Sequence, residues 1–175
     1  MDAWLDRLRA EITETTADLN NSDWSRAPRG RWDSAQIVEH LGRTYGTTAK
    51  MLELKMGIGG PPQVRTAKVG EFLLKVLIVD LGIFPSGAKA PEMVTPTGVA
   101  GPVALERALI SLERMDAALT AAEERWGRQE AIAMHFRLGP LTALQWRKFH
   151  YYHGHHHMLQ IRKRSATAQY DKADQ

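Results

Sequence analysis

Several long segments of this chain place apolar residues three and four positions apart, the spacing that gathers them on one face of an α-helix. The clearest covers 102–126, where a proline stands in the first turn, as it commonly does in helices. Its apolar stripe consists of Leu105, Leu109, Leu112, Met115, Leu119, Ala122 and Trp126. A second stripe, in 4–19, consists of Leu5, Leu8, Ile12 and Leu19. Because each stripe has to be buried against a neighbour, the sequence predicts an all-α fold of packed helices.

Two further helices begin at capping boxes. Asp33 and Thr142 each have a glutamine three residues later, and the two side chains of such a pair satisfy each other's free backbone amides. These helices are expected over 34–56 and 143–164. With no internal repeat in the chain, four long helices predict a four-helix bundle.

The connection over 57–102 is too long for a hairpin between antiparallel helices. It predicts a crossover, which a bundle needs when its second and third helices run in the same direction. Within it, the apolar segment 72–84 is expected as a buried or subunit-facing helix. This segment is too short to span a bilayer and contains Lys75 and Asp80, so no membrane association is expected.

Two stretches fall outside the predicted helices. Residues 128–139 have no regular period, and 132–138 hints at extended structure before Gly139-Pro140. The last residues, 166–175, are expected to form a flexible C-terminal tail. The remaining 1–165 are of the length of one ordinary domain.

Composition narrows the chemistry. The chain contains no cysteine, which excludes disulfides and thiolate metal ligands. Its net charge of +3 comes from basic and acidic residues interleaved along the chain, so no nucleic-acid partner is expected. The N-terminal residues are acidic where a signal peptide has basic ones, which predicts a cytoplasmic protein.

Four of the seven histidines lie at 153, 155, 156 and 157. On a helix, His153 and His157 share a face, while His155 points the opposite way. His40 lies in the apolar stripe of the 34–56 helix. Three imidazoles from facing helices, with an open fourth position, suit zinc, nickel or a similar divalent ion. The alternative is that each histidine is a hydrogen-bonded core residue, and spacing alone leaves both open.

Three segments together resemble the DinB-like family, and most closely a functionally uncharacterised branch of it: Trp32–Leu41, Gly139–Trp146 and His153–Ile161. The resemblance extends from the first helix to about Arg162. It implies an up-down-down-up four-helix bundle, often dimeric, so a homodimer is expected. It also implies a metal held by one histidine of the second helix and two of the fourth, which match His40, His153 and His157.

Several members of that family are thiol-dependent transferases or isomerases. The resemblance therefore implies a divalent-metal-dependent enzyme that acts on a small-molecule substrate, with a low-molecular-weight thiol as co-substrate and zinc or nickel as the metal. An ion that activates water in a hydrolase is the related possibility. The alternatives are a non-catalytic metal-binding bundle that acts in dimerisation or ligand sensing, and a metal-free interaction module. No catalytic residue and no organic cofactor is assigned.

The remaining polar candidates are weaker. Glu39, next to His40, points about 100° away on the helix and is expected to be a surface charge. Thr44 and Thr48 are expected to serve helix packing. His150 is a candidate for contact with a ligand histidine or substrate, and His135 is expected to have no role in the site.

Overall fold

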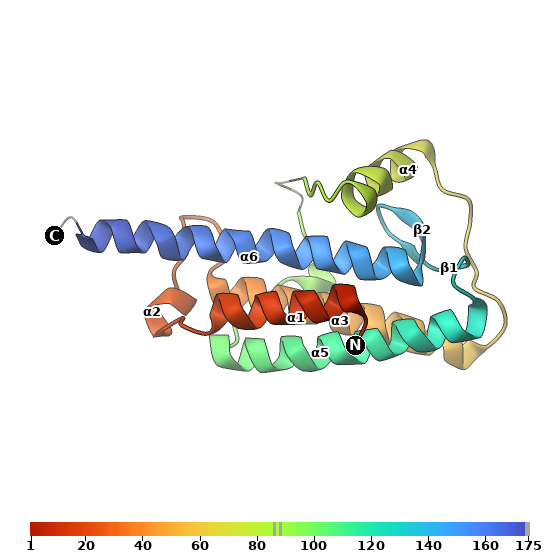
Figure 1. Ribbon diagram of the computed structural model, residues 1–175, viewed down its shortest axis with the longest axis horizontal. Coiled ribbons are helices and arrows are strands. Elements are labelled where there is room, and N and C mark those ends of the chain that lie inside the picture. Colours follow the sequence, from red (N-terminus) through yellow and green to blue (C-terminus); the bar gives the residue numbers. More distant parts are fainter. Residues whose placement is uncertain (86, 88, 174–175) are drawn as a thin grey trace.

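The computed structural model describes residues 1–85, 87 and 89–173, with side chains as far as Arg164. The chain is mostly helical (Figure 1). The long helices are α1 (Ala3–Thr16), α3 (Ser34–Ile58), α5 (Gly101–Trp126) and α6 (Ala143–Ala173). The shorter elements are helix α2 (Asn21–Trp24), helix α4 (Val69–Lys75), a π-helical turn η1 (Val76–Asp80), a 3₁₀ turn η2 (Glu92–Val94) and strands β1 (Ala131–His135) and β2 (Gly139–Thr142).

The long helices lie side by side, with α3 and α5 running in one direction and α1 and α6 in the other (Figure 1). The most extensive contact joins α3 to α5, and α1 packs mainly on α6. Small residues bring α3 and α5 close together, since a Cβ atom on Gly42 would lie 3.0 Å from the Cα atom of Ala108. Most residues of the predicted stripes are buried: Leu5, Leu8, Ile12, Leu112, Met115, Leu119 and Ala122. The others, Leu19, Leu105, Leu109 and Trp126, are partly buried against the same core, and Leu19 lies beyond the end of α1.

Both predicted capping boxes are present. The amide of Gln36 donates to Asp33 Oδ1 over 2.7 Å, and the amide of Asp33 donates back to Gln36 Oε1 over 3.0 Å. The amide of Thr142 donates to Gln145 Oε1 over 3.0 Å, and the amide of Gln145 to Thr142 Oγ1 over 3.3 Å. These boxes set where α3 and α6 begin, and therefore which way each later side chain points.

Helix α6 continues to Ala173, past the end expected near 164. The flexible tail predicted for 166–175 falls on residues whose side chains, and for 174–175 also whose backbone, lie outside the described residues. It stays a prediction.

The expectation of an all-α fold is wrong in one place. Strands β1 and β2 form an antiparallel pair, with Ala133 opposite Leu141 and His135 opposite Gly139. The extended structure suggested for 132–138 is therefore present over 132–135. A hairpin this short has too few residues for a strand period to be recognised, and it is held by burying Ile132 and Leu141 against the helices.

The apolar segment 72–84 is also not the single helix that was expected. It divides between α4, which has no buried residue, and η1, which buries Ile78 and Val79. Phe72 and Leu73 are more than half exposed. The segment reaches α6 at two places: η1 packs on it, and the ring of Phe84 at the end of the segment lies against Phe149 and His153. No helix among the described residues is long and apolar enough to cross a bilayer.

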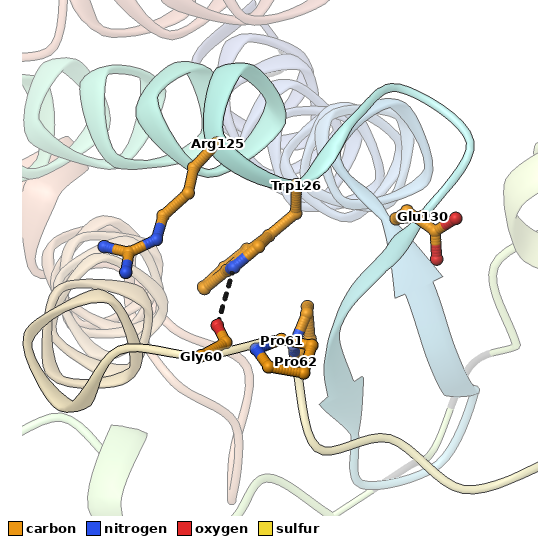
Figure 2. Close-up of a pocket in the computed structure, with 6 residues that line it drawn as sticks. All are labelled: Gly60, Pro61, Pro62, Arg125, Trp126 and Glu130. Carbon is orange, nitrogen blue, oxygen red and sulfur yellow. Dashed lines mark hydrogen bonds between the residues drawn. The ribbon is translucent and has the colours of Figure 1, made fainter.

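The far end of α3 is tied to the end of α5. Gly59 ends α3 with a φ of +83°, a conformation that glycine adopts readily, and Trp126 Nε1 donates to the carbonyl of Gly60 over 3.0 Å (Figure 2). Pro61 and Pro62 border an open hollow of about 450 Å³ beside Trp126 (Figure 2). This hollow lies about 27 Å along α3 from His40, taking 1.5 Å per residue, so it is separate from the histidines.

A glycine on α6 allows α1 and α3 to pack against the histidine-rich turn. A Cβ atom on Gly154 would overlap Leu8 and lie 3.1 Å from Tyr45 Oη. Gly154→Ala is therefore expected to lower the free energy of unfolding by about 1–3 kcal/mol through overpacking, as measured by urea denaturation. Gly57→Ala is the matched control, because nothing lies within 4 Å of the added methyl group, and it should be neutral or slightly stabilising. Equal stabilities of the two variants would contradict this packing.

Candidate metal centre

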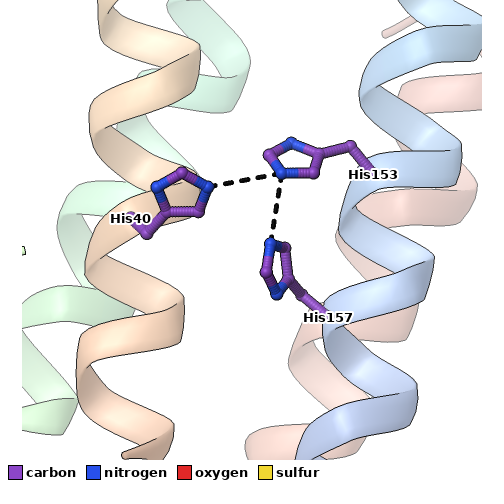
Figure 3. Close-up of side chains that lie close together, drawn as sticks. All are labelled: His40, His153 and His157. Atoms are coloured by element: carbon purple, nitrogen blue, oxygen red, sulfur yellow. Dashed lines mark hydrogen bonds between the residues drawn. The ribbon is translucent and has the colours of Figure 1, made fainter. Parts of the chain in front are cut away.

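The structure brings together the three histidines singled out in the sequence (Figure 3). His40 comes from the second turn of α3, and His153 and His157 lie one turn apart on α6. His153 Nε2 is 3.3 Å from His40 Nε2 and 3.1 Å from His157 Nε2. The three residues are 4%, 7% and 9% exposed, in the order of the chain.

The outer nitrogens of two rings decide where the inner lone pairs point. His40 Nδ1 donates to the carbonyl of Val94 over 2.9 Å, because a carbonyl can only accept. His157 Nδ1 donates in the same way to Gln160 Oε1 over 3.0 Å. In each neutral ring the proton is thus on Nδ1, and the Nε2 lone pair faces the same spot. Outer hydrogen bonds of this kind are typical of metal-binding histidines.

The position of the proton on the His153 ring shows whether the three histidines can satisfy one another without a cation. Its Nδ1 is buried and has no hydrogen-bond partner among the described residues. If its proton is on Nε2, it can satisfy only one of two facing lone pairs; if it is on Nδ1, three lone pairs face one another. A divalent cation would accept all three.

The distances agree with this reading. Two nitrogens bound tetrahedrally to one zinc at about 2.0–2.1 Å lie about 3.3–3.4 Å apart, close to the separations of His153 Nε2 from its two neighbours. Imidazole donors alone suit zinc or nickel and do not choose between them.

All three rings are held in the form that binds metals. Burial lowers the pKa of His153 well below its usual value, and repulsion from the other histidines, His157 first, adds to this. Burial and the neighbouring His40 lower the pKa of His157 to about 3. Burial also lowers the pKa of His40, although its bond to Val94 opposes the shift. The imidazoles are therefore neutral at pH 7 with free lone pairs.

Aromatic rings surround the histidines. Trp32 lies 5.0 Å from His40 between ring centres, and Phe84 and Phe149 stack on His153 at 5.1 Å and 5.6 Å. Such walls exclude water and strengthen the electrostatic interactions of a bound cation.

The family model described as the DinB superfamily matches residues 5–161. The chain belongs to the DinB superfamily. No curated protein and no solved structure matches it significantly. The matched region includes His40, His153 and His157, along with both capping boxes.

In this DinB superfamily chain, Glu39 is not the surface charge expected from the sequence, since it is only 7% exposed. Its Oε1 accepts from the amide and hydroxyl of Thr97 over 2.8 and 2.6 Å, and its Oε2 accepts from the amides of Gly98 and Val99 over 2.8 and 3.2 Å. Burial alone raises the pKa of Glu39, but these bonds outweigh it and lower the pKa to about 2. Glu39 does point away from the histidine cluster, as its position on the helix predicts, but residues 97–99 of the crossover cover that side of α3.

Glu39 and His40 together fasten one stretch of the crossover to α3. His40 holds the carbonyl of Val94, and Glu39 holds the backbone of 97–99. The carboxylate that binds this segment thus helps to keep the Val94 carbonyl against the His40 ring.

The other polar candidates lie outside the three-histidine cluster. His150 is fully buried, and its Nε2 is 3.2 Å from Thr48 Oγ1. His135, also buried, accepts the amides of Arg137 and Leu138 at Nδ1. The hydroxyl of Thr44 donates to the carbonyl of His40 over 2.8 Å, a bond within α3.

The flanking histidines of α6 have partners of their own. His155 Nδ1 lies 2.9 Å from Glu11 Oε1 on α1, so it faces away from the cluster as its position predicted. Gln160 Nε2 donates to His156 Nε2 over 2.9 Å, while its Oε1 accepts from His157.

Three supporting residues were missed from the sequence. Gln160 had a usable signal, because it stands three residues after His157 and four after His156, within reach of both on a helix. No sequence signal pointed to Val94 or Phe84, because both lie in the crossover, where no periodic spacing of apolar residues indicates which side chains face the histidines.

His150 should make the metal-free protein less stable in mild acid. Burial, with repulsion from His135, lowers the pKa of His150 to about 3, against an ordinary value of 6.5. Between these values the unfolded chain binds the extra proton, so the free energy of unfolding falls as pH decreases, by up to about 1.4 kcal/mol per unit. We expect His150→Gln to flatten the dependence measured by urea denaturation between pH 7 and 5, and the half-exposed control His155→Gln to retain the wild-type slope. Identical slopes in wild type and His150→Gln would contradict the assignment.

Proposed function

We propose that this protein is a divalent-metal-dependent enzyme that transfers a low-molecular-weight thiol to an electrophile, or isomerises a substrate through a thiol adduct. His40, His153 and His157 are the proposed ligands of zinc or nickel. The observation that carries the proposal is the convergence of their Nε2 atoms while the outer nitrogens of His40 and His157 are occupied as donors. No arrangement of the ring protons satisfies all three inner nitrogens, whereas one cation does.

The proposed scaffold is an up-down-down-up four-helix bundle made by α1, α3, α5 and α6 within one domain, 1–165. The parallel course of α3 and α5 and the long crossover between them support this topology. We further propose a cytoplasmic homodimer. The exposed apolar side chains of α4, Val69, Phe72 and Leu73, support a subunit contact.

A divalent ion held by three neutral imidazoles supplies a Lewis acid with an open position, which lowers the pKa of a bound thiol or water. The residues of the chain prepare this site. Val94 and Gln160 hold the protons of His40 and His157 on Nδ1, which leaves both Nε2 atoms free. Trp32 and Phe84 keep bulk water from the rings.

The thiol has to come from a second molecule, because the chain has no cysteine. No carboxylate base is part of the proposal. Among the described residues, no acidic side chain joins the cluster, and Glu39, the nearest in sequence, is fully engaged with 97–99.

One observation favours a second candidate, a non-catalytic ion that staples α3 to α6. None of the three histidines is more than 9% exposed, and neither of the two hollows described is lined by any of them. A structural ion needs no access for substrate, whereas a catalytic ion does.

The metal site predicts about one divalent ion per chain. Elemental analysis of purified protein should find zinc or nickel in that ratio. His153→Ala should remove it, because His153 is the ring shared by both short contacts. His155→Ala, on the opposite side of α6, should keep the wild-type content. Metal-free wild type, or undiminished metal in His153→Ala, would rule out the site.

Thiol-dependent turnover separates the two candidates. With glutathione, cysteine or another small thiol and 1-chloro-2,4-dinitrobenzene, the enzyme should form the thioether at a rate that falls at least about tenfold in His153→Ala, as loss of a Lewis acid requires. The absorbance of the product measures this rate. If wild type and variant are equally slow with every thiol while a chelator still lowers the melting temperature, the result supports a structural ion and contradicts the enzyme.

A further inference from the structure

Arg164 is the arginine of α6 that remains without a partner near the histidine cluster. Its Nη1 is buried, and no hydrogen bond or ion pair engages it within the described part of the chain. Leaving a charged donor buried and unsatisfied is costly, so such a group calls for an explanation.

Other arginines of the same helix are engaged. Arg147 contacts Glu123 and donates to Thr120 over 3.1 Å. Arg162, two residues before Arg164, lies 3.4 Å from Glu11 and donates to Thr15. Arg147 Nε also lacks a hydrogen bond, but it lies 3.8 Å from Asp2 Oδ2 and 3.9 Å from Asp116 Oδ1. Among the described residues, both neighbouring guanidinium groups thus have a carboxylate partner, and Arg164 has none.

Helical spacing places Arg164 on the face of α6 that carries the cluster. It stands seven residues after His157, about 10.5 Å along the helix, and four after Gln160, which holds the His157 ring. Side chains on a helix lean toward its N-terminus, so the long Arg164 side chain extends back toward that ring. Burial and His40 lower the pKa of His157 most, and the charge of Arg164 adds to the shift, which agrees with this proximity.

The segment 31–33, just before α3, forms the other side of this region. The ring of Trp32 lies tilted against His40, with 5.0 Å between the ring centres, and the charges of Asp33 and Arg31 both act on Arg164. Asp33 does not neutralise it: Asp33 Oδ1 caps the amide of Gln36, and no ion pair between described residues joins Asp33 to Arg164. Among the described residues, the result is a guanidinium group near His157 with no hydrogen bond or ion pair.

We propose that Arg164 binds the carboxylate of a small ligand whose other end occupies the histidine site. This inference rests on the proposed function and narrows its substrate class to small molecules that carry a carboxylate near the reacting group. A guanidinium presents parallel N–H donors that match a carboxylate, and the pairing would satisfy the open Nη1.

The test compares two thiols that differ in charge. Binding of 3-mercaptopropionate and 2-mercaptoethanol to the zinc-loaded protein is measured by calorimetry. Wild type should bind the carboxylate thiol at least about tenfold more tightly, as one charge-assisted pair allows. Arg164→Gln should lose this preference and keep its zinc and its affinity for 2-mercaptoethanol. Arg162→Gln is the matched control and should retain the preference.

A second measurement does not require the ion. Acetate and acetamide are titrated into the metal-free protein while the resonance of the Arg164 guanidinium is followed by NMR. Acetate alone should shift that resonance, with Arg164→Lys as a variant that keeps the charge if Arg164→Gln fails to fold.

The outcomes separate the two proposals. Absence of zinc or of 2-mercaptoethanol binding, with an intact acetate response, would remove the metal-dependent enzyme and leave the anion subsite. An equal preference for the carboxylate thiol in wild type and Arg164→Gln, or no acetate response at Arg164, would overturn the subsite and leave the metal site standing.

Discussion

The organisation of this molecule depends on the burial of three neutral imidazoles with their Nε2 atoms facing one another. Burying a polar ring nitrogen in an apolar interior costs free energy unless that nitrogen has a partner. Val94 and Gln160 accept hydrogen bonds from Nδ1 of His40 and His157. The Nε2 atoms of these two rings therefore carry lone pairs, and His153 has one proton at most to offer them. The hydrogen bonds at the outer nitrogens of His40 and His157 thus leave the inner nitrogens of the cluster as a set of lone pairs that a cation would stabilise.

The crossover between α3 and α5 does more than connect them. It provides the carbonyl that orients His40 and the ring of Phe84 that covers His153, and Glu39 binds its backbone with both carboxylate oxygens. Glu39 and His40 are adjacent, so the turn of α3 that presents the His40 ring also anchors the segment that orients this ring. A carboxylate used in this way serves positioning and is not available for proton transfer.

Much of the scaffold could be predicted because its signals are local. The capping boxes at Asp33 and Thr142 and the apolar stripes of α1 and α5 depend on residues three or four apart, and the structure contains both boxes and buries most of each stripe. The sheet, the division of 72–84 between α4 and η1, and the burial of Glu39 were not foreseen. Each depends on which distant segment covers the residue, and no spacing within the segment records that.

For the site, the sequence by itself determined which histidines can share a face: helical geometry put His153 and His157 together, turned His155 away and left His40 on the inner side of another helix. Tertiary structure decided that α3 and α6 bring His153 Nε2 within 3.3 Å of the Nε2 atoms of His40 and His157, and that Val94 and Gln160 determine which nitrogen of those two rings is protonated. It also decided that Arg164 has no partner among the described residues. The reason is physical. The direction of a side chain follows from the local helix, whereas its partner and its exposure to water follow from packing between segments far apart in the chain.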